Sequence, residues 1–193
     1  MTQLNLFGGS RQSLIDDASG AVVFMPDWLE APTAAAWFAT LLADMPWRGG
    51  RRVMYEREVD VPRLRAHFAG ADPALHPILR EAIARVSQAM GAPFNSVGLN
   101  LYRDQHDSVA PHNDKLADLV RDQPIVLLSL GATRRMTIRA KRVPRRVLHV
   151  DLAAGSLLLM DWTSQLHYDH GIPKQHDAVG PRISIAFRVR PGH

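Results

Sequence analysis

Residues 181–188 constrain the fold more than any other stretch of this chain. Their side chains alternate strictly between two sides of an extended backbone. One side carries Arg182, Ser184, Ala186 and Arg188, and the other carries Ile183, Ile185, Phe187 and Val189. The pattern predicts a late strand with one apolar face and one face that holds two arginines. Buried arginines need anionic partners, so we expect a β-rich fold built around an anion-binding site.

A second constraint is the pair His112 and Asp114, which are two residues apart. In an extended chain both side chains project to one side and can bind one metal ion together. With a third, distant histidine they would complete the facial triad that holds Fe(II) and leaves coordination positions open. His170 is the candidate because it follows the apolar run 157–160, and by spacing alone His149 and His167 remain alternatives.

The segment 96–103 has the same alternation as the late strand. Asn100 and Tyr102 share one side, while Val97, Leu99 and Leu101 face away. A dicarboxylate cosubstrate would suit such a lining, with a bidentate guanidinium pair at one end. Six strand residues span roughly 20 Å, so Arg182 and Arg188 are not neighbours. We assign Arg182 to the distal carboxylate and Arg188 to the end nearer the metal.

Taken together, the motifs resemble the AlkB family of Fe(II)/2-oxoglutarate-dependent dioxygenases, and most closely its nucleic-acid alkylation-repair branch. The resemblance covers residues 27–190 and rests on Asn100-Leu-Tyr102, His112-x-Asp114, Ser129-Leu-Gly131, His170 with Pro173-Lys174, and Arg182-x-Ser-x-x-Phe-Arg188. It implies a mainly β chain with flanking helices (α+β): a double-stranded β-helix, or jelly roll, with an N-terminal substrate-lid extension.

The resemblance also implies the ligands of the site. His112, Asp114 and His170 would bind Fe(II). The cosubstrate 2-oxoglutarate would be held by Asn100, Tyr102, Arg182, Ser184 and Arg188. No catalytic residue separate from the metal centre is expected.

The implied activity is oxidative demethylation of alkylated bases of the 1-methyladenine or 3-methylcytosine type, with release of formaldehyde, succinate and CO2. The partner would be nucleic acid: single- or double-stranded DNA, or RNA. Two alternatives remain. One is an AlkB-like dioxygenase that acts on modified RNA, a protein or a small metabolite. The other is a non-enzymatic nucleic-acid-binding jelly roll.

The resemblance places a substrate lid in the N-terminal half. Residues 52–56 and 59–64 predict two short strands around a hairpin turn, where the repair branch carries a wedge that fills the gap left by a flipped nucleotide. Tyr55 stands at the wedge position, with packing onto the sheet as the alternative. The lid strand 62–68 carries Arg63 and Phe68, which we expect to contact the substrate.

The chain departs from the family pattern at two places. Lys115 follows Asp114 where the repair enzymes carry an acidic residue that helps to recognise the alkylated base. The lid strand ends in His67-Phe68 in place of the family's Trp-Tyr. Both departures favour a different substrate. We nevertheless count Lys115 among the substrate contacts.

Basic residues form two clusters in a chain of net charge +4. The first contains Arg48, Arg51, Arg52 and Arg57, and the denser second one contains Arg134, Arg135, Arg139, Lys141, Arg142, Arg145 and Arg146. Such clusters can neutralise phosphates, so we expect Arg134 and Arg135 to contact nucleic acid. The alternative is an ordinary solvated surface.

Length and composition indicate one domain. A chain of 193 residues can bury roughly 70% of its unfolded surface. The absence of cysteine excludes disulfides and thiolate metal sites. We expect a flexible arm at 1–20, with a joint at residues 8–10, and one dioxygenase domain at 21–193. Within it, 21–92 would form helices and the nucleotide-recognition lid, and 93–190 the jelly-roll catalytic core.

Periodicity and capping residues predict the remaining elements. Helices are expected at 33–44, capped by Thr33, and at 72–90, capped by Asp72 and ended by Gly91. Strands are expected at 21–25, 95–103, 124–130, 135–139, 146–152, 156–161 and 182–190. Neither a signal peptide nor an apolar run near 18 residues is evident, so we expect a cytoplasmic monomer without membrane contact.

Overall fold

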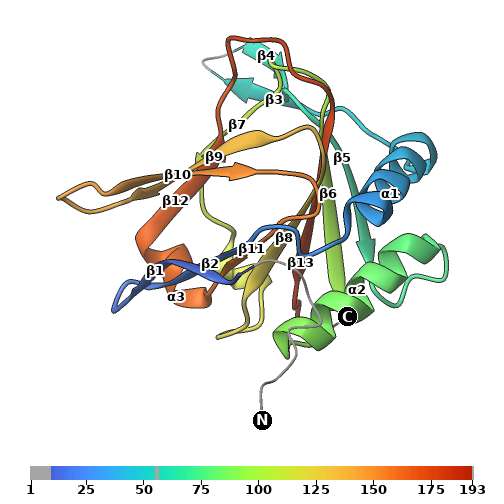
Figure 1. Ribbon diagram of the computed structural model, residues 1–193. Coiled ribbons are helices and arrows are strands. Elements are labelled where there is room, and N and C mark those ends of the chain that lie inside the picture. Colours follow the sequence, from blue (N-terminus) through green and yellow to red (C-terminus); the bar gives the residue numbers. More distant parts are fainter. Residues whose placement is uncertain (1–9, 55–56, 193) are drawn as a thin grey trace.

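Two antiparallel sheets form the body of the molecule (Figure 1). The computed structural model describes residues 10–54 and 57–192. The larger sheet has the strand order β1-β2-β11-β8-β13-β6-β5, and the smaller one β10-β9-β12-β7. A separate two-stranded sheet pairs β3 with β4.

The larger sheet is built from strands of four to seven residues. These are β1 (Gln12–Asp17), β2 (Gly20–Met25), β5 (Leu64–Ala69), β6 (Ser96–Tyr102), β8 (Ile125–Gly131), β11 (Leu157–Met160) and β13 (Arg182–Arg188). The smaller sheet contains β7 (Val109–His112), β9 (Arg134–Ala140), β10 (Val147–Leu152) and β12 (Tyr168–Ile172). The remaining elements are β3 (Arg51–Met54), β4 (Arg57–Asp60), α1 (Ala31–Asp44), α2 (Pro77–Met90), α3 (Trp162–His167) and the 3-10 turn η1 (Leu116–Asp118).

The two faces of the larger sheet are buried against different partners. Its outer face packs on α1 and α2, and this layer contains Leu99, Leu128, Ile183 and Phe187. Its inner face packs on the smaller sheet, and this layer contains Tyr102, Met136, Ile138 and Ala186. The predicted alternation of β6 and β13 is confirmed, because their apolar sides meet the helices and their polar sides point between the sheets.

The predicted helices form, but their first turns differ from expectation. Helix α1 begins at Ala31, with Glu30 at the N-cap position and a proline in the first turn, so Thr33 is not the cap. Helix α2 begins at Pro77, and its cap is the ring nitrogen Nδ1 of His76, which accepts the N–H of Ile78 at 3.2 Å. A proline at the first position suits the helical φ. Gly91 ends α2 in the left-handed region, as predicted.

The predicted flexible arm at 1–20 is wrong from residue 12 onward. Residues Gln12–Asp17 form β1, which pairs with β2 at the edge of the larger sheet. Its anchor is Ile15, which is 1% exposed within the layer between the sheets. Leu14 packs against the same layer, while the remaining positions of the strand are polar. Residues 1–9 lie outside the described part of the chain.

None of the helices within residues 10–54 and 57–192 has the length and hydropathy that a membrane span requires.

Candidate active site

The two predicted metal-binding histidines face each other across one strand pair. His112 ends β7, and His170 lies opposite it in the register of β12. Their ring centroids are 4.6 Å apart. His149 lies on β10 at the far edge of the smaller sheet, exposed and within 3.3 Å of the Thr137 hydroxyl. The topology therefore favours His170 over His149 as the partner of His112.

Both imidazoles are held in a form that can bind a metal. The ring nitrogen Nδ1 of His112 lies 2.9 Å from the carbonyl oxygen of Ala110. Since a carbonyl only accepts, Nδ1 must donate, and in the neutral ring Nε2 then carries the lone pair that a metal needs. Burial lowers the pKa of His170 to about 3, and the proximity of His112 adds to the effect. His170 is therefore neutral at pH 7, as ligation requires.

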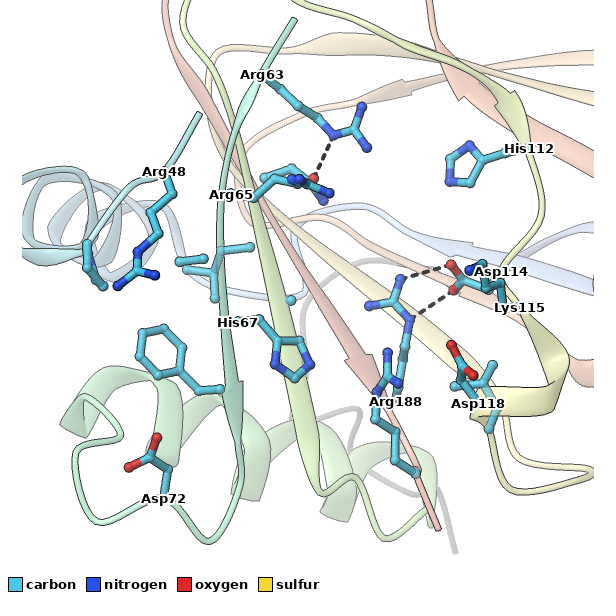
Figure 2. A pocket seen from close by; sticks show the side chains of 18 of the residues that line it. Arg48, Arg63, Arg65, His67, Asp72, His112, Asp114, Lys115, Asp118 and Arg188 are labelled. Atoms are coloured by element: carbon cyan, nitrogen blue, oxygen red, sulfur yellow. Dashed lines mark hydrogen bonds and ion pairs between the residues drawn. The ribbon is translucent and has the colours of Figure 1, made fainter. Parts of the chain in front are cut away.

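Asp114 lies just beyond β7 and is held by Arg188, at the end of β13 (Figure 2). Nε and Nη2 of Arg188 donate to its two carboxylate oxygens at 2.9 and 3.1 Å. Burial alone would raise the pKa of Asp114, but the charge and hydrogen bonds of Arg188 outweigh it, so the pKa lies below its ordinary value. Asp114 is therefore ionised at neutral pH.

The donor set of this region fits Fe(II). Two neutral imidazoles and one carboxylate are the ligand types of the facial triad. Among the described residues, no three such side chains already converge as a metal cluster. The carboxylate of Asp114 is turned to Arg188. Metal binding thus requires Asp114 to share its oxygens between Arg188 and the ion, which a carboxylate with about four lone-pair sites can do.

A buried arginine between the sheets fits the cosubstrate. Arg182 is 1% exposed, and its Nη2 donates to the Ser129 hydroxyl at 2.9 Å. Its Nε and Nη1 are buried and make no well-formed hydrogen bond to the described residues. Burial lowers the pKa of Arg182 to about 10, which still leaves it charged at pH 7. Buried donors without partners point to an absent acceptor, and a carboxylate of 2-oxoglutarate has the matching geometry.

Three further predicted cosubstrate residues lie near this arginine on β6 and β13. Arg182 lies opposite Tyr102 in the β13–β6 register, and Ser184 lies opposite Asn100. The guanidinium carbon of Arg182 is 5.4 Å from the Tyr102 ring centroid. Burial raises the pKa of the Tyr102 phenol, although Arg182 and other cations oppose it. The phenol is therefore protonated and can donate to a carboxylate.

A cavity of about 860 Å³ opens beside His112 and Asp114. Its charged lining comprises Arg48, Arg63, Arg65, Lys115, Arg188 and Arg190 together with Asp72, Asp114 and Asp118. His112, Asn100, His67 and Phe68 also line it. Residues of β5 line one wall of the cavity, and His112 at the end of β7 lines another. The cavity therefore lies between the candidate metal residues and β5.

Three of the predicted substrate contacts line this cavity, namely Arg63, Phe68 and Lys115. Arg63 also reaches the cosubstrate region, since its Nε donates to Oδ1 of Asn100 at 2.8 Å. Tyr55 lies outside the described residues. A strand occurs where the sequence placed the lid strand, as the edge strand β5, and its role as a lid stays a prediction.

The predicted nucleic-acid contact at Arg134 is wrong, whereas the contact predicted for Arg135 stays a prediction. Arg134 is fully buried and donates to the carbonyl oxygens of Asp104, Asp107 and Pro173 at 2.8 to 2.9 Å. Arg135 points to the other side of β9 and pairs with Asp151 at 2.7 Å. Neither lines the cavity. Consecutive residues of a strand point to opposite faces of the sheet. Arg134 and Arg135 therefore cannot contact the same nucleic acid from one face.

The structure adds two residues that the sequence did not reveal. Gln165 of α3 is 1% exposed, and its Oε1 accepts the backbone N–H of Asp114 at 3.2 Å. Lys141 donates to Oδ1 of Asn113 at 3.0 Å and to the carbonyl oxygen of Gln165 at 2.8 Å. Together they fix the segment that carries Asp114. The one sequence sign of α3 is Asp161, whose carboxylate accepts the N–H of Ser164 as the helix cap.

Comparisons with known proteins agree with this geometry. The model of the 2OG-Fe(II) oxygenase superfamily matches residues 21–188. The human alpha-ketoglutarate-dependent dioxygenase alkB homolog 3 is 29% identical over 196 residues, which cover 92% of this chain and 68% of that protein. The bovine DNA oxidative demethylase ALKBH2 is 34% identical over 119 residues, 58% of this chain and 43% of that protein.

A solved structure shows the same fold. The structure of OsALKBH1 superposes with a TM-score of 0.66 over 94% of this chain and 100% of that chain, at 14% identity. At that identity the likeness concerns the fold alone, and it confirms the predicted jelly roll. The chain spans less than half the length of the bovine ALKBH2.

Proposed function

This chain belongs to the 2OG-Fe(II) oxygenase superfamily and, within it, to the AlkB family. It is therefore an Fe(II)- and 2-oxoglutarate-dependent dioxygenase, and we propose that it demethylates alkylated nucleic-acid bases of the 1-methyladenine or 3-methylcytosine type. The substrate assignment goes further than the family, and it has its own support in the cavity.

The observation that carries the proposal is the cavity beside His112 and Asp114. Its volume of about 860 Å³ lies within the range of small-molecule sites, roughly 300 to 1,000 Å³, and is sufficient for one base with its sugar. Its arginines can neutralise the phosphates on either side of an extruded nucleotide. The name of the ALKBH2 relatives, DNA oxidative demethylase, supports the same class of reaction.

The metal and the cosubstrate have separate sets of residues in this proposal. His112, Asp114 and His170 hold Fe(II), and Asn100, Tyr102, Arg182, Ser184 and Arg188 hold 2-oxoglutarate. When bound, Fe(II) and 2-oxoglutarate together use O2 to oxidise a substrate C–H bond, with succinate and CO2 as products. An oxidised N-methyl group leaves as formaldehyde, and the base regains its N–H or lone pair.

The chain's own contribution is orientation. The free N–H donors of Arg182 would grip the distal carboxylate, while Ser129 fixes the guanidinium from the other side. The protonated Tyr102 phenol would add a donor to the same carboxylate. Besides its place in the cosubstrate set, Arg188 holds the carboxylate of Asp114 through Nε and Nη2. A proton-transferring side chain is not required, because the hydrogen removed is bound to carbon.

A second candidate function is the same chemistry on a different substrate. Lys115 favours it, because this exposed cation lines the cavity next to Asp114. A positive side chain there disfavours a positively charged base. A neutral base or a substrate with an anionic group would meet no such penalty.

The test is mass spectrometry of a single-stranded oligonucleotide with one 1-methyladenine or 3-methylcytosine, incubated with the protein, Fe(II), ascorbate and 2-oxoglutarate. Loss of one methyl mass with the wild type, and none with Asp114→Ala, is the expected result. Asp122→Asn, a change of one charge at an exposed turn, should retain activity. Succinate formation without demethylation would favour the second candidate, and absence of both products would contradict the proposal.

A further inference from the structure

The charge of the cavity raises a question about the bases that it admits. Adenine methylated at N1 and cytosine methylated at N3 are cations at neutral pH. The cavity is lined by six arginine or lysine side chains and three aspartates. A cation that leaves water for such a site needs a carboxylate close by, because an uncompensated buried charge is costly.

Two of the three carboxylates are already engaged. Asp114 is held by Arg188 through two hydrogen bonds and is a candidate metal ligand. The Oδ1 of Asp72 accepts the N–H of Ala74 at 2.8 Å within a turn. In the view of Figure 2, Asp72 lies on the far side of His67 from Asp114. It is therefore poorly placed to meet a base that must approach the metal residues.

Asp118 is the third carboxylate, and its position is built by η1. Its N–H donates to the carbonyl oxygen of Lys115 at 3.0 Å, and the N–H of Leu119 donates to that of Leu116 at 3.1 Å. This single turn leads the chain back to the cavity wall just after Asp114. Leu119 is 8% exposed, and the N–H of Val120 donates to the carbonyl oxygen of Val189 at 2.9 Å. The turn is thus anchored to the end of β13.

The carboxylate of Asp118 is also available. Within residues 10–54 and 57–192 the structure gives it neither a hydrogen bond nor an ion pair, and the side chain is exposed into the cavity. In Figure 2 it lies on the same side of the cavity as Asp114 and Lys115. Lys115, which departs from the family pattern, and Asp118 therefore belong to the same turn.

We propose that Asp118 is a specificity-determining residue that supplies the negative charge for a cationic alkylated base. The inference rests on the proposed demethylase function and adds a residue to it. Lys115 and Asp118 act in opposite directions: the lysine opposes the entry of a cationic base, and the aspartate attracts it. Lys115 stands where the repair enzymes carry an acidic residue. Three residues later, η1 places the carboxylate of Asp118 at the cavity.

The decisive variant is Asp118→Asn, which keeps the size of the side chain and removes its charge. Two oligonucleotides of identical sequence are compared, one with cationic 1-methyladenine and one with neutral 3-methylthymine. We expect kcat/KM to fall about tenfold for the first, in line with a charged hydrogen bond worth roughly 1.5 kcal/mol, and to change little for the second. Lys115→Gln should shift the ratio of the two values the opposite way.

The matched control is Asp122→Asn. It removes the same charge from the next turn, outside the cavity lining. Its φ of 62° is one that asparagine tolerates well. Because it weakens or strengthens phosphate binding equally for both oligonucleotides, it should leave the ratio unchanged.

The outcomes separate the two levels of the hypothesis. If Asp118→Asn alters both substrates equally, or behaves like Asp122→Asn, the role of Asp118 is overturned while demethylation stands. If the wild type demethylates neither oligonucleotide, the proposed function fails. Fluorescence anisotropy with the same two oligonucleotides then still decides on Asp118, because a selective loss of affinity for the cationic base is expected without turnover.

Discussion

His112 and His170 occupy opposing positions in the β7–β12 pair, with ring centroids 4.6 Å apart. Two strands distant in sequence thus present two imidazoles to one point, and Asp114 follows two residues after the first of them. We expect Mn²⁺, as a redox-stable substitute for Fe(II), to raise the melting temperature of the wild type. Because each triad member contributes a ligand, His112→Ala, Asp114→Ala and His170→Ala should each abolish the rise, measured by differential scanning fluorimetry.

The controls for metal binding are the two histidines that spacing could not exclude. His149→Ala and His167→Ala should keep the full metal-dependent rise, since His149 lies on the outer strand β10 and His167 ends α3. Loss of the rise in either variant, with retention in His170→Ala, would contradict the assignment of the third ligand.

The Asp114–Arg188 pair predicts a pH-dependent stability of the metal-free protein. The pKa of Asp114 in the folded state is lower than in the unfolded state. Its contribution is therefore present above about pH 4 and lost as the pH falls through the lowered pKa. At pH 7 we expect Asp114→Asn to reduce the free energy of unfolding by roughly 3 kcal/mol, because it leaves a buried cation unpaired.

Urea unfolding between pH 7 and pH 3 would measure this effect. The difference between wild type and Asp114→Asn should begin to shrink below about pH 4 and vanish below the lowered pKa, where both proteins carry a neutral group opposite Arg188. The exposed pair of Arg121 and Asp122 offers the comparison, and Asp122→Asn should change stability little at any pH. A gap that stays constant for Asp114→Asn would count against the ion pair.

Arg182 should separate cosubstrate binding from stability. Arg182→Met replaces a buried cation with an apolar side chain of similar length. Removal of the donors should raise the dissociation constant of 2-oxoglutarate about 100-fold, or roughly 2.7 kcal/mol. The melting temperature should stay level or rise, because a buried charge no longer requires compensation.

Isothermal titration calorimetry with Mn²⁺ present would give the dissociation constant for each variant. Arg135→Met is the control, as its arginine lies on the exposed side of β9 in the smaller sheet and pairs with Asp151. Unchanged affinity in Arg182→Met would place the distal carboxylate elsewhere.

The tip of the β9–β10 hairpin should contribute to nucleic-acid binding. Residues 142–146 are exposed and include Arg142 and Arg145, and Figure 1 shows the hairpin extending beyond the sheet. Lys141 ties its base to Asn113. We expect Arg142→Ala/Arg145→Ala to lower affinity for single-stranded DNA. The slope of log K against log salt should become shallower by about 1.4, or about 0.7 for each phosphate that is no longer neutralised.

Anisotropy titrations at several salt concentrations would measure that slope. Arg85→Ala/Arg121→Ala removes the same charge at exposed positions outside the hairpin and the cavity lining. Equal slopes for the two double variants would indicate a general effect of net charge and contradict a specific role of the hairpin.

The strands that the sequence predicted are those with a buried apolar side. In β6 and β13 the alternation was complete, and it also revealed which residues face inward. β7 and β12 were not predicted, because β7 contains Pro111 and β12 contains Asp169, His170 and Gly171. Proline is tolerated in β7 because that strand lies at a sheet edge. The elements that carry the metal residues thus have weak strand patterns of their own.

Site residues that belong to a local sequence motif could be predicted. Those whose position depends on a contact with a distant part of the chain could not. Arg182 and Tyr102 followed from parity on two strands. Gln165 and Lys141 reach Asp114 and Asn113 across gaps in sequence that no local pattern reveals. Arg134 was misassigned because a basic run is typical of a surface, whereas three backbone carbonyls hold this side chain inside.

Strand β5 pairs with only one neighbour in the larger sheet, β6, so within the described residues it forms an edge of that sheet. The wall proposed to meet the substrate is therefore the outermost strand, and the residues that would hold iron and 2-oxoglutarate lie on interior strands or on the opposite sheet. Leu64, Ala66 and Phe68 of β5 pack on the helix-backed layer, whereas Arg65 and His67 are exposed and can be replaced without loss of those contacts. Exposed substrate contacts on this outermost strand can therefore change while the strands that carry the proposed oxidising centre keep their packing.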